Sequence, residues 1–320
     1  MARINLDYAA STPLLPEVKE AMAVALEEAG NPSSIHHEGQ RAKRQLEHAR
    51  TQVALLLNAK SEEISFTSCG TESNNWAIRG FMSANRRKGN HLIISAIEHP
   101  SVGLATRRLE QEGVQVTILP VDGEGVVSPS ALKTALKPET VLVSIMLANG
   151  EVGTIEPIAE LAAVAHEHGA LFHTDAIAAV GHIVVDVKQL GVDALSLAAN
   201  QFYGPQGAAA LFVREGLRIL PLLEGGGQES GNRSGTEAIP AIVGMGAAAE
   251  LTRHRLPQRI ERLTQLRDRL RDGLTARIEQ LRLNGSWSSR LPHHLHVCVE
   301  GASSESLVLG LDHVGIAVGL

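Results

Sequence analysis

The sequence contains few aromatic residues and few cysteines. Phe, Trp and Tyr make up 3% of its 320 residues, so we expect a core built from Ala, Leu, Val and Ile. Cys69 and Cys298 are too few for a disulfide framework and suit a reducing compartment. No apolar run has the length of a membrane span, and the first residues lack the pattern of a signal peptide. These absences predict a soluble, cytoplasmic protein with no membrane partner.

Clustered positive charge is also lacking. The net charge is −6, whereas a general nucleic-acid binder needs Lys and Arg gathered on one face. The Arg-rich stretch from Arg253 to Arg282 alternates with Glu and Asp, which is typical of a solvated helix face. We therefore expect no nucleic-acid partner.

Short β-rich apolar runs alternate with amphipathic helical patterns over the first 250 residues. This alternation predicts a largely parallel α/β sheet with helices on both faces, and the chemistry of such sheets lies at the carboxyl ends of the strands. The predicted strands are Ile64–Thr67, His91–Ala96, Gln115–Leu119, Val141–Leu147, Ala170–Thr174, Asp193–Ala198 and Ala208–Val213, and the predicted helices include Glu17–Glu28, Arg41–Leu57 and Ile158–His168.

The pattern changes after Glu250. Leucine and isoleucine recur every three or four residues from Leu256 to Ile278, which predicts one long amphipathic helix. A strand around Leu295–Val299 and a helix over Ser304–Leu311 come next, so a thin α+β domain is expected that looks incomplete. The predicted domains are a large one, residues 15–251, and a small one, residues 1–14 plus 252–320.

The segment from Ser68 to Ser73 comes after a predicted strand and opens a helix. Free backbone N–H groups, Gly70 for close approach and the Thr71 hydroxyl together form a phosphate cradle. The same residues fit an ordinary capping box in which Thr71 is the cap, so the segment alone leaves both alternatives open.

Two side chains come directly after predicted strands. Asp175 can hold a protonated ring nitrogen and make a pyridine an electron sink, or it can cap a helix. His99 lies between Glu98 and Pro100, where its ring could stack on a flat cofactor, although a lone His is more often structural.

A glycine-rich loop runs from Gly225 to Thr236. Such loops bring the backbone close to a ligand or another subunit, and Arg233 and Thr236 could both contact a phosphate. The alternative is a plain flexible loop.

Taken together, these motifs resemble the cysteine desulfurases of the class V aminotransferase group along nearly the whole chain. The resemblance implies a pyridoxal-phosphate (PLP) transferase fold of type I, a seven-stranded sheet and a homodimer with cofactor sites near its interface. Thr71 and the backbone near Gly70 would hold the phosphate, His99 would stack on the ring, Asp175 would pair with the pyridine nitrogen, and Thr236 would reach the neighbouring subunit's phosphate. Other motifs that carry the resemblance are Leu6-Asp7-Tyr8-Ala9-Ala10-Ser11-Thr12-Pro13, Gly30-Asn31-Pro32-Ser33-Ser34, Glu72-Ser73-Asn74-Asn75, Val141-Leu142-Val143-Ser144-Ile145-Met146, Tyr203-Gly204-Pro205, Arg233-Ser234-Gly235-Thr236 and Glu305-Ser306-Leu307.

The sequence departs from this family at positions that carry the chemistry. By resemblance, Gln201 occupies the Schiff-base lysine position and Asn200 the adjacent His position, and an amide is not a usable amine nucleophile. Ala198, Ala178 and Gly150 replace a Ser, a Gln and an Asn, and each lost hydrogen bond to a ligand costs about 0.5–1.5 kcal/mol. We expect weak PLP binding at best, no covalent attachment and no catalytic residue for desulfuration.

The family places its persulfide-forming cysteine on a loop shortly after the segment matching Gly315–Val318, where this sequence ends. We therefore expect a C-terminally truncated small domain, with apolar surface around Leu307–Val318 covered by a protein partner or by the dimer mate. Cys298 is expected to be a small core residue on a strand, and neither it nor Cys69 lies where the nucleophile belongs.

A histidine run near the C-terminus is a candidate for a metal site. His294 and His296 would share one face of a strand, near His293, and imidazole pairs bind Zn or Ni. Two ligands are too few and no nearby Cys or His completes the set, so no metal is expected.

Three functional hypotheses remain. In the first, the chain is a non-catalytic desulfurase homologue that acts as a binding or regulatory protein. In the second, it is an enzyme of altered chemistry that uses Asp175, His99 and Thr71 around noncovalently held PLP or a related phosphate ligand. In the third, a separate polypeptide supplies the missing segment. We favour the first, because the site has lost groups that the chemistry needs.

Overall fold

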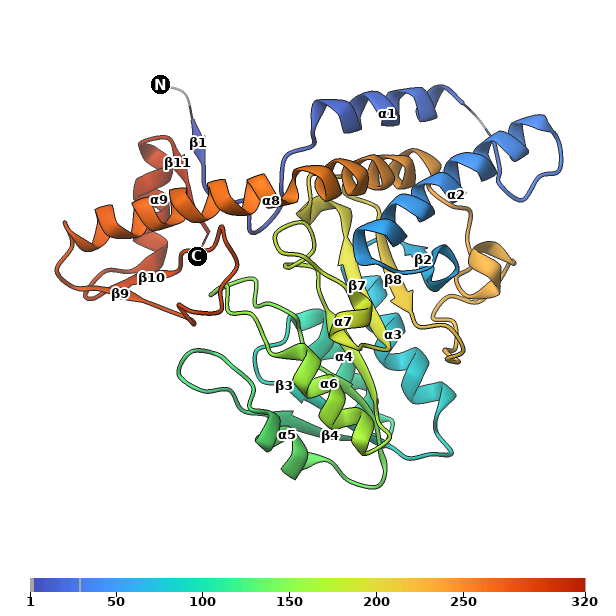
Figure 1. Cartoon of the computed structure of the whole chain (residues 1–320), viewed down its shortest axis with the longest axis horizontal. Coiled ribbons are helices and arrows are strands. Elements are labelled where there is room, and N and C mark those ends of the chain that lie inside the picture. Colours follow the sequence, from blue (N-terminus) through green and yellow to red (C-terminus); the bar gives the residue numbers. More distant parts are fainter. Residues whose placement is uncertain (1–2, 29, 320) are drawn as a thin grey trace.

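The computed structural model describes residues 3–28 and 30–319 and is built round one seven-stranded sheet (Figure 1). The strand order is β2-β8-β7-β6-β5-β3-β4, and β8 runs antiparallel to both of its neighbours while β4, β3, β5, β6 and β7 pair in parallel. The predicted mostly parallel seven-stranded sheet is therefore confirmed. The strands are β2 (Ile64–Thr67), β3 (His91–Ser95), β4 (Gln115–Leu119), β5 (Thr140–Ser144), β6 (Leu171–Asp175), β7 (Ala194–Ala198) and β8 (Ala209–Val213).

Helices cover both faces of the sheet. Successive side chains of a strand point to opposite faces, so on β3 Ile93 joins one buried cluster with α1, α2, α5, α6 and α8, whereas Leu92 and Ile94 join a second cluster with α3 and α4. The helices are α1 (Pro16–Glu27), α2 (His37–Leu57), α3 (Gly70–Ala84), α4 (Pro100–Gln111), α5 (Pro129–Ala135), α6 (Ile158–Glu167), α7 (Val187–Leu190), α8 (Ile239–Thr275) and α9 (Ser304–His313), with 3-10 turns η1 (Ser61–Glu63), η2 (Ala199–Gln201) and η3 (Gln228–Gly231).

The long helix α8 begins much earlier than the sequence predicts. Its first part is apolar and buried against α1 and α2, and a Cβ at Gly246 would lie only 2.6 Å from the Ala49 Cα of α2. The two backbones therefore approach closely because position 246 has no side chain. The predicted domain boundary at residues 251 and 252 falls inside α8, and the division into two domains stays a prediction.

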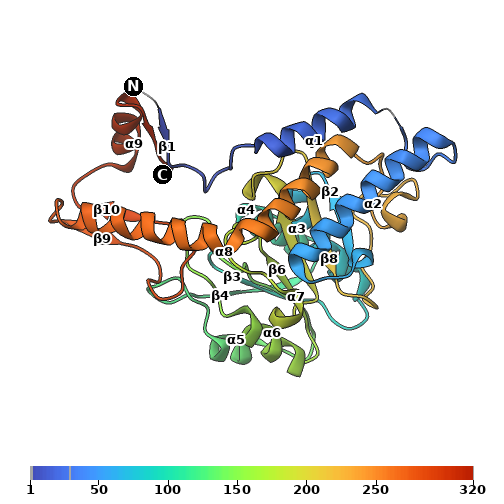
Figure 2. The ribbon, with the colours of Figure 1, turned by 45° about the horizontal axis from the view of Figure 1, so that its top comes forward.

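The C-terminal part extends from the far end of α8 (Figure 2). The strands β9 (Leu281–Leu283) and β10 (Val297–Val299) form an antiparallel pair. The strands β1 (Ile4–Asn5) and β11 (Ile316–Ala317) pair in parallel, so the two ends of the chain meet. Beside them, α9 has no buried residue.

Two predictions for this part are wrong. The predicted strand around Leu295–Val299 begins only at Val297, so His293, His294 and His296 lie in the irregular segment before β10 and not on one face of a strand. Cys298 lies on β10 but is exposed, because the two-stranded β9–β10 pair leaves one face uncovered.

A buried ion pair holds the glycine-rich loop against α2. Both terminal nitrogens of Arg50 donate to the Glu229 carboxylate, at 2.6 and 2.9 Å, and the Phe66 backbone N–H donates to the same carboxylate at 2.9 Å. The Glu229 side chain is 2% exposed. Its charge is therefore removed from water and depends on Arg50 for compensation.

We predict that Arg50→Met destabilises the protein by about 3–5 kcal/mol, because the substitution leaves the Glu229 carboxylate buried without a counter-charge. Urea unfolding at neutral pH measures the effect. Arg41→Met is the matched control on the same helix: the Arg41–Glu28 pair is more exposed, so its loss should cost less than about 1 kcal/mol. Equal losses of unfolding free energy in the two variants would show that the Arg50–Glu229 pair is not the more important of the two for stability.

Candidate functional site

The helix α3 starts directly after β2, with Cys69 as its N-cap and no side-chain capping bond. The capping alternative with Thr71 as the cap is therefore wrong. Glu72 instead reaches back, and its Oε2 accepts hydrogen bonds from the Ser68 N–H at 2.7 Å and from the Ser68 hydroxyl at 2.5 Å. The turn at the start of α3 is thus fixed by Glu72, while no side chain caps the first N–H groups.

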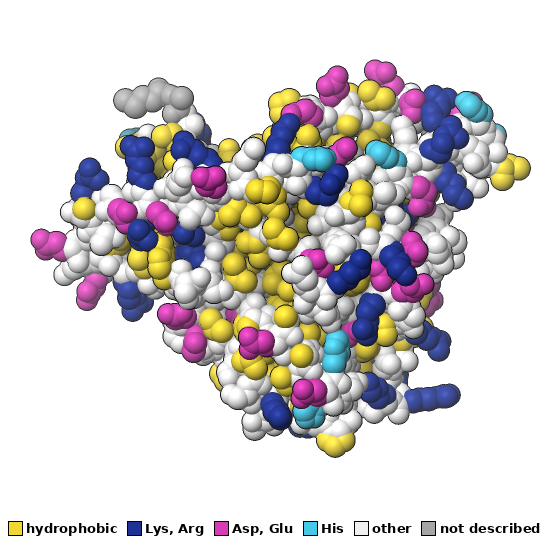
Figure 3. All heavy atoms as spheres, viewed as in Figure 1, with side chains coloured by type: hydrophobic (Ala, Val, Ile, Leu, Met, Phe, Trp, Pro, Cys, Tyr) yellow, Lys and Arg dark blue, Asp and Glu magenta, His cyan; other side chains and the backbone are white. Residues whose placement is uncertain are grey.

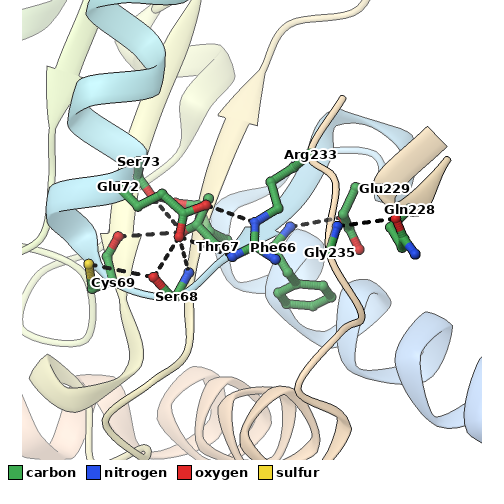
Figure 4. Close-up of polar contacts among 11 residues, drawn as sticks. Phe66, Thr67, Ser68, Cys69, Glu72, Ser73, Gln228, Glu229, Arg233 and Gly235 are labelled. Atoms are coloured by element: carbon green, nitrogen blue, oxygen red, sulfur yellow. Dashed lines mark hydrogen bonds and ion pairs between the residues drawn. The ribbon is translucent and has the colours of Figure 1, made fainter. Parts of the chain in front are cut away.

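Arg233 ties the glycine-rich loop to this turn (Figure 4). Its Nε donates to Glu72 Oε1 at 2.7 Å and its Nη2 to Glu72 Oε2 at 3.2 Å. Burial opposes ionisation of Glu72, but the hydrogen bonds from Arg233 and Ser68 prevail and lower its pKa. Arg233 is therefore engaged by a carboxylate of its own chain.

Three of the predicted site residues line two separate cavities, whereas Gly70 and Asp175 line neither of the two. Thr71 and His99 line one of about 380 Å³ between α3 and α4. Thr236 is exposed and lines another of about 90 Å³, together with Ser68 and Arg233. The structure thus brings Thr71 and His99 together and places Thr236 apart from them.

Asp175 lies at the carboxyl end of β6 and is buried. Its Oδ2 accepts from Asn74 Nδ2 at 2.6 Å and its Oδ1 from the Ile177 N–H at 2.9 Å. Burial raises the pKa of this carboxyl group, and the two hydrogen bonds partly oppose the rise.

Asn74 and Ser101 connect Asp175 to His99. Asn74 Nδ2 also donates to Ser101 Oγ at 2.9 Å, and Ser101 Oγ lies 2.8 Å from His99 Nδ1. Sequence reasoning did not assign a role to either connecting residue. The available signal was that Asn74 lies one turn after Gly70, on the same helical face, among buried residues of α3.

Gln201 ends η2 and is buried. Its Nε2 donates to the carbonyls of Ala9 and Ala10, both at 3.2 Å, and the Asn200 carbonyl accepts from the N–H and the hydroxyl of Thr12, both at 2.8 Å. The side-chain amide of Gln201 is therefore committed to the N-terminal segment.

Small residues surround this part of the site. A Cβ at Gly70 would lie 2.2 Å from Ile177 Cδ1 and 3.7 Å from Ala198 Cβ, so a larger residue at position 70 would require the Ile177 side chain to move. A Cβ at Gly150 would lie 3.7 Å from Ala178 Cβ. Three of the positions that depart from the resembled family are thus Gly or Ala, without side-chain hydrogen bonding.

Three histidines pack behind η2. The rings of His182 and His293 stack with centroids 3.8 Å apart, and His294 meets His293 edge-on at 4.3 Å. His182 Nε2 bonds to the Gln201 carbonyl and His294 Nε2 to the Gly150 carbonyl, at 2.9 and 2.8 Å. Burial lowers the pKa of all three, that of His182 to about 4. Within residues 3–28 and 30–319, no group of three His, Cys, Asp or Glu side chains has a metal-binding arrangement.

Glu98 precedes His99 and has a buried carboxyl group. Its Oε1 accepts from the Ser95 hydroxyl at 2.6 Å and from the Met146 N–H at 2.9 Å, while Oε2 has no partner among the described residues. Burial raises the pKa of Glu98 to about 8. Glu98 is therefore mainly protonated at neutral pH, directly beside the candidate site.

In the part of the chain that the structure describes, no helix combines the length and apolar character that crossing a bilayer needs.

Sequence comparisons match nearly the whole chain to one family and to relatives that share one name. The family described as "Aminotransferase class-V" matches residues 4–319. The chain is 50% identical to "Cysteine desulfurase IscS" of Dictyoglomus turgidum over 316 residues, which cover 98% of this chain and 80% of the relative. It is 47% identical to the protein of the same name from Methanosarcina thermophila, covering 98% and 78%.

Comparisons with solved structures agree with the sequence comparisons. A solved "NifS-like protein" superposes with a TM-score of 0.96 at 35% identity, covering 99% of this chain and 87% of the other. The apo structure of a cysteine desulfurase from Thermococcus onnurineus NA1 superposes with a TM-score of 0.90 at 27% identity, covering 98% and 83%.

The raised pKa of Glu98 predicts a pH-dependent stability. The folded state retains the Glu98 proton up to about pH 8, whereas the unfolded chain loses it near pH 4.5. The contribution of Glu98 is therefore fully present below pH 4.5 and is lost as the pH rises through 8, by up to about 1.4 kcal/mol per pH unit.

Glu98→Gln should remove this slope, so the variant should gain stability relative to the native protein between about pH 6 and about pH 9. Urea unfolding at both pH values measures the difference. Glu110→Gln, an exposed substitution on α4, should leave the pH dependence unchanged. If the free energy of unfolding changes with pH in the same way in Glu98→Gln and in the native protein, Glu98 is ionised in the folded state.

Proposed function

The chain belongs to the class V aminotransferase family and is homologous to cysteine desulfurases, and from this premise we propose that it is a desulfurase-like protein that does not desulfurate cysteine. It acts instead as a binding or regulatory homologue. The observation that carries the proposal is the residue at position 201, which is a glutamine.

Gln201 stands, by resemblance, where the family has the lysine that attaches PLP. Its nitrogen belongs to an amide and is not a nucleophile, and it already donates to the carbonyls of Ala9 and Ala10. Lys188, the last lysine in the sequence, is exposed on α7 and donates to Asn58 Oδ1 at 3.3 Å. It precedes β7, whereas η2 comes after β7, so Lys188 is a poor substitute.

The remaining residues fit only part of PLP. The uncapped start of α3 with Gly70 and Thr71 suits its phosphate, Asp175 suits a protonated ring nitrogen, and His99 borders the same cavity as Thr71. Attachment at position 201 does not fit. We therefore infer that any PLP is held without a covalent bond and weakly.

A homodimer is part of the proposal. Thr236 is exposed and does not line the cavity that Thr71 and His99 share, which supports a role toward the neighbouring subunit. Apolar side chains gather below the middle of α8 on the face shown in Figure 3, and Leu307, Leu309 and Val314 are exposed in the C-terminal part. Such surfaces favour a partner or dimer contact.

A second candidate is an enzyme of altered chemistry with noncovalently held PLP or a related phosphate ligand. The buried Asp175 carboxyl group favours it, because its position at the carboxyl end of β6 suits a protonated ring nitrogen. A bound PLP would supply an electron-withdrawing ring, and Asp175 would hold the proton on its nitrogen.

We predict that purified protein incubated with PLP acquires no pyridoxyl adduct on reduction with borohydride, as measured by intact-protein and peptide mass spectrometry. Gln201→Lys should acquire one at residue 201, together with a visible absorbance band, because an amine is restored there. Gln206→Lys, an exposed substitution five residues later, is the control and should not. An adduct in the native protein would refute the proposal, and a Gln201→Lys variant without one would refute the assignment of position 201.

For the second candidate, Asp175→Asn should weaken noncovalent PLP uptake about tenfold or more, since a hydrogen bond to a charged group contributes about 1.5–3 kcal/mol. Equilibrium dialysis measures the affinity. If the native protein takes up PLP and the variant binds it equally well, Asp175 does not contact the ligand and this candidate fails.

A further inference from the structure

The hydrogen bonds of His99 determine which of its ring nitrogens carries a proton. The Ser101 backbone N–H donates to His99 Nδ1 at 3.1 Å. A backbone N–H can only donate, so Nδ1 is the acceptor, and a neutral imidazole then has its proton on Nε2.

The Ser101 hydroxyl adds a second donor to the same nitrogen. Ser101 Oγ lies 2.8 Å from His99 Nδ1 and receives a hydrogen bond from Asn74 Nδ2 at 2.9 Å. Since Asn74 donates to this oxygen, the hydroxyl hydrogen is available for His99.

The orientation of the Asn74 amide is set by Asp175. Oδ2 of this carboxylate lies 2.6 Å from the amide nitrogen, and a carboxylate accepts, so the nitrogen and not the oxygen of the amide must face it. Asn74 and Ser101 are both buried. The Asn74 amide therefore donates in both directions, to the Asp175 carboxylate and to the Ser101 hydroxyl, and that hydroxyl donates to the His99 ring.

We propose that Ser101 and Asn74 are positioning residues that hold His99 as the Nε2–H tautomer, with that N–H available to the cavity between α3 and α4. Nε2 makes no hydrogen bond to any of the described residues, and His99 is an exposed residue on the cavity wall. The ring thus offers a donor to whatever the cavity binds.

The other polar groups on this wall point to the class of ligand. Thr71, Arg79 and Arg108 are donors, and none of the lining residues is a carboxylate, although both arginines also pair with Glu112 outside the lining. A ligand that presents a hydrogen-bond acceptor, such as a phosphate ester or a carboxylate, matches this lining. This statement about the ligand rests on the proposed function, whereas the tautomer does not.

Long-range ¹H–¹⁵N spectra of the ligand-free protein, with ¹⁵N-labelled histidine, test the proposal. His99→Gln assigns the signals. In the native protein, Nδ1 of His99 should have a pyridine-like shift and Nε2 a pyrrole-like shift. A protonated Nδ1 in the neutral ring would overturn the proposal.

Ser101→Ala should shift the ratio of the two tautomers toward Nδ1–H by about fivefold, the effect of losing one hydrogen bond. Ser101→Thr retains the hydroxyl and should restore the native ratio. Thr106→Val is the matched control, because it removes a buried hydroxyl of the same helix that bonds to the Gly103 carbonyl instead. An unchanged ratio in Ser101→Ala, or an equal change in Thr106→Val, would overturn the role of Ser101.

The protein samples for these spectra contain no PLP. A pyridoxyl adduct on the native protein would refute the proposed function while leaving the tautomer result readable, and a wrong tautomer would refute the positioning role while leaving the proposed function intact.

Discussion

A carboxylate buried at the carboxyl end of β6 constrains the whole site. Asp175 lies inside the protein, so its charge or its proton must be hydrogen-bonded. Asn74 of α3 meets this need and extends the network through Ser101 to His99 at the start of α4. The hydrogen-bonding requirement of one buried carboxyl group therefore links β6 to α3, to the start of α4 and to the His99 ring.

At the same end of the sheet, position 201 is bonded to the N-terminal segment. The side-chain amide nitrogen of Gln201 donates to the carbonyls of Ala9 and Ala10. A Cβ added at Gly150 would reach ordinary van der Waals distance of the Ala178 Cβ. Position 201 thus contributes to holding the N-terminal segment in place. The retained Asp175, His99 and Thr71 are the groups that support ligand binding in the proposal.

Much of this architecture could be predicted from the sequence, because local patterns carry the information for it. All seven strands of the sheet were predicted, most within one residue at each end, because they are apolar runs between turn residues. Strands β1 and β11 were not, since each has two residues and their pairing joins opposite ends of the chain, Ile4 with Ile316. The start of α8 was also missed, because an Ala- and Gly-rich stretch shows little helical periodicity.

The residues of the site that lie at strand ends could be predicted from the sequence, but the hydrogen bonds that connect them could not. Asp175 ends a strand, and His99, Thr71 and Gly70 follow strands closely, so their convergence on one edge of the sheet is a consequence of topology. The link through Asn74 and Ser101 depends on side-chain distances between two helices, and no sequence spacing encodes such distances. The histidine stack was misjudged for the same reason, because His182 comes from the segment between β6 and β7, far from His293 in the sequence.

Two residues of the glycine-rich loop have a strained backbone conformation that contacts within the protein stabilise. Glu229 and Ser230 both have positive φ, 48° and 58°, although neither is glycine. Each such residue costs of the order of 1–3 kcal/mol, so the loop would relax if nothing held it. The bidentate contact of Arg50 with Glu229 and that of Arg233 with Glu72 hold it at two points. Thr236 is consequently exposed at the surface on a loop that two ion pairs hold in place. A contact made from such a loop loses little conformational entropy, which is the physical reason to expect that the loop serves an interface.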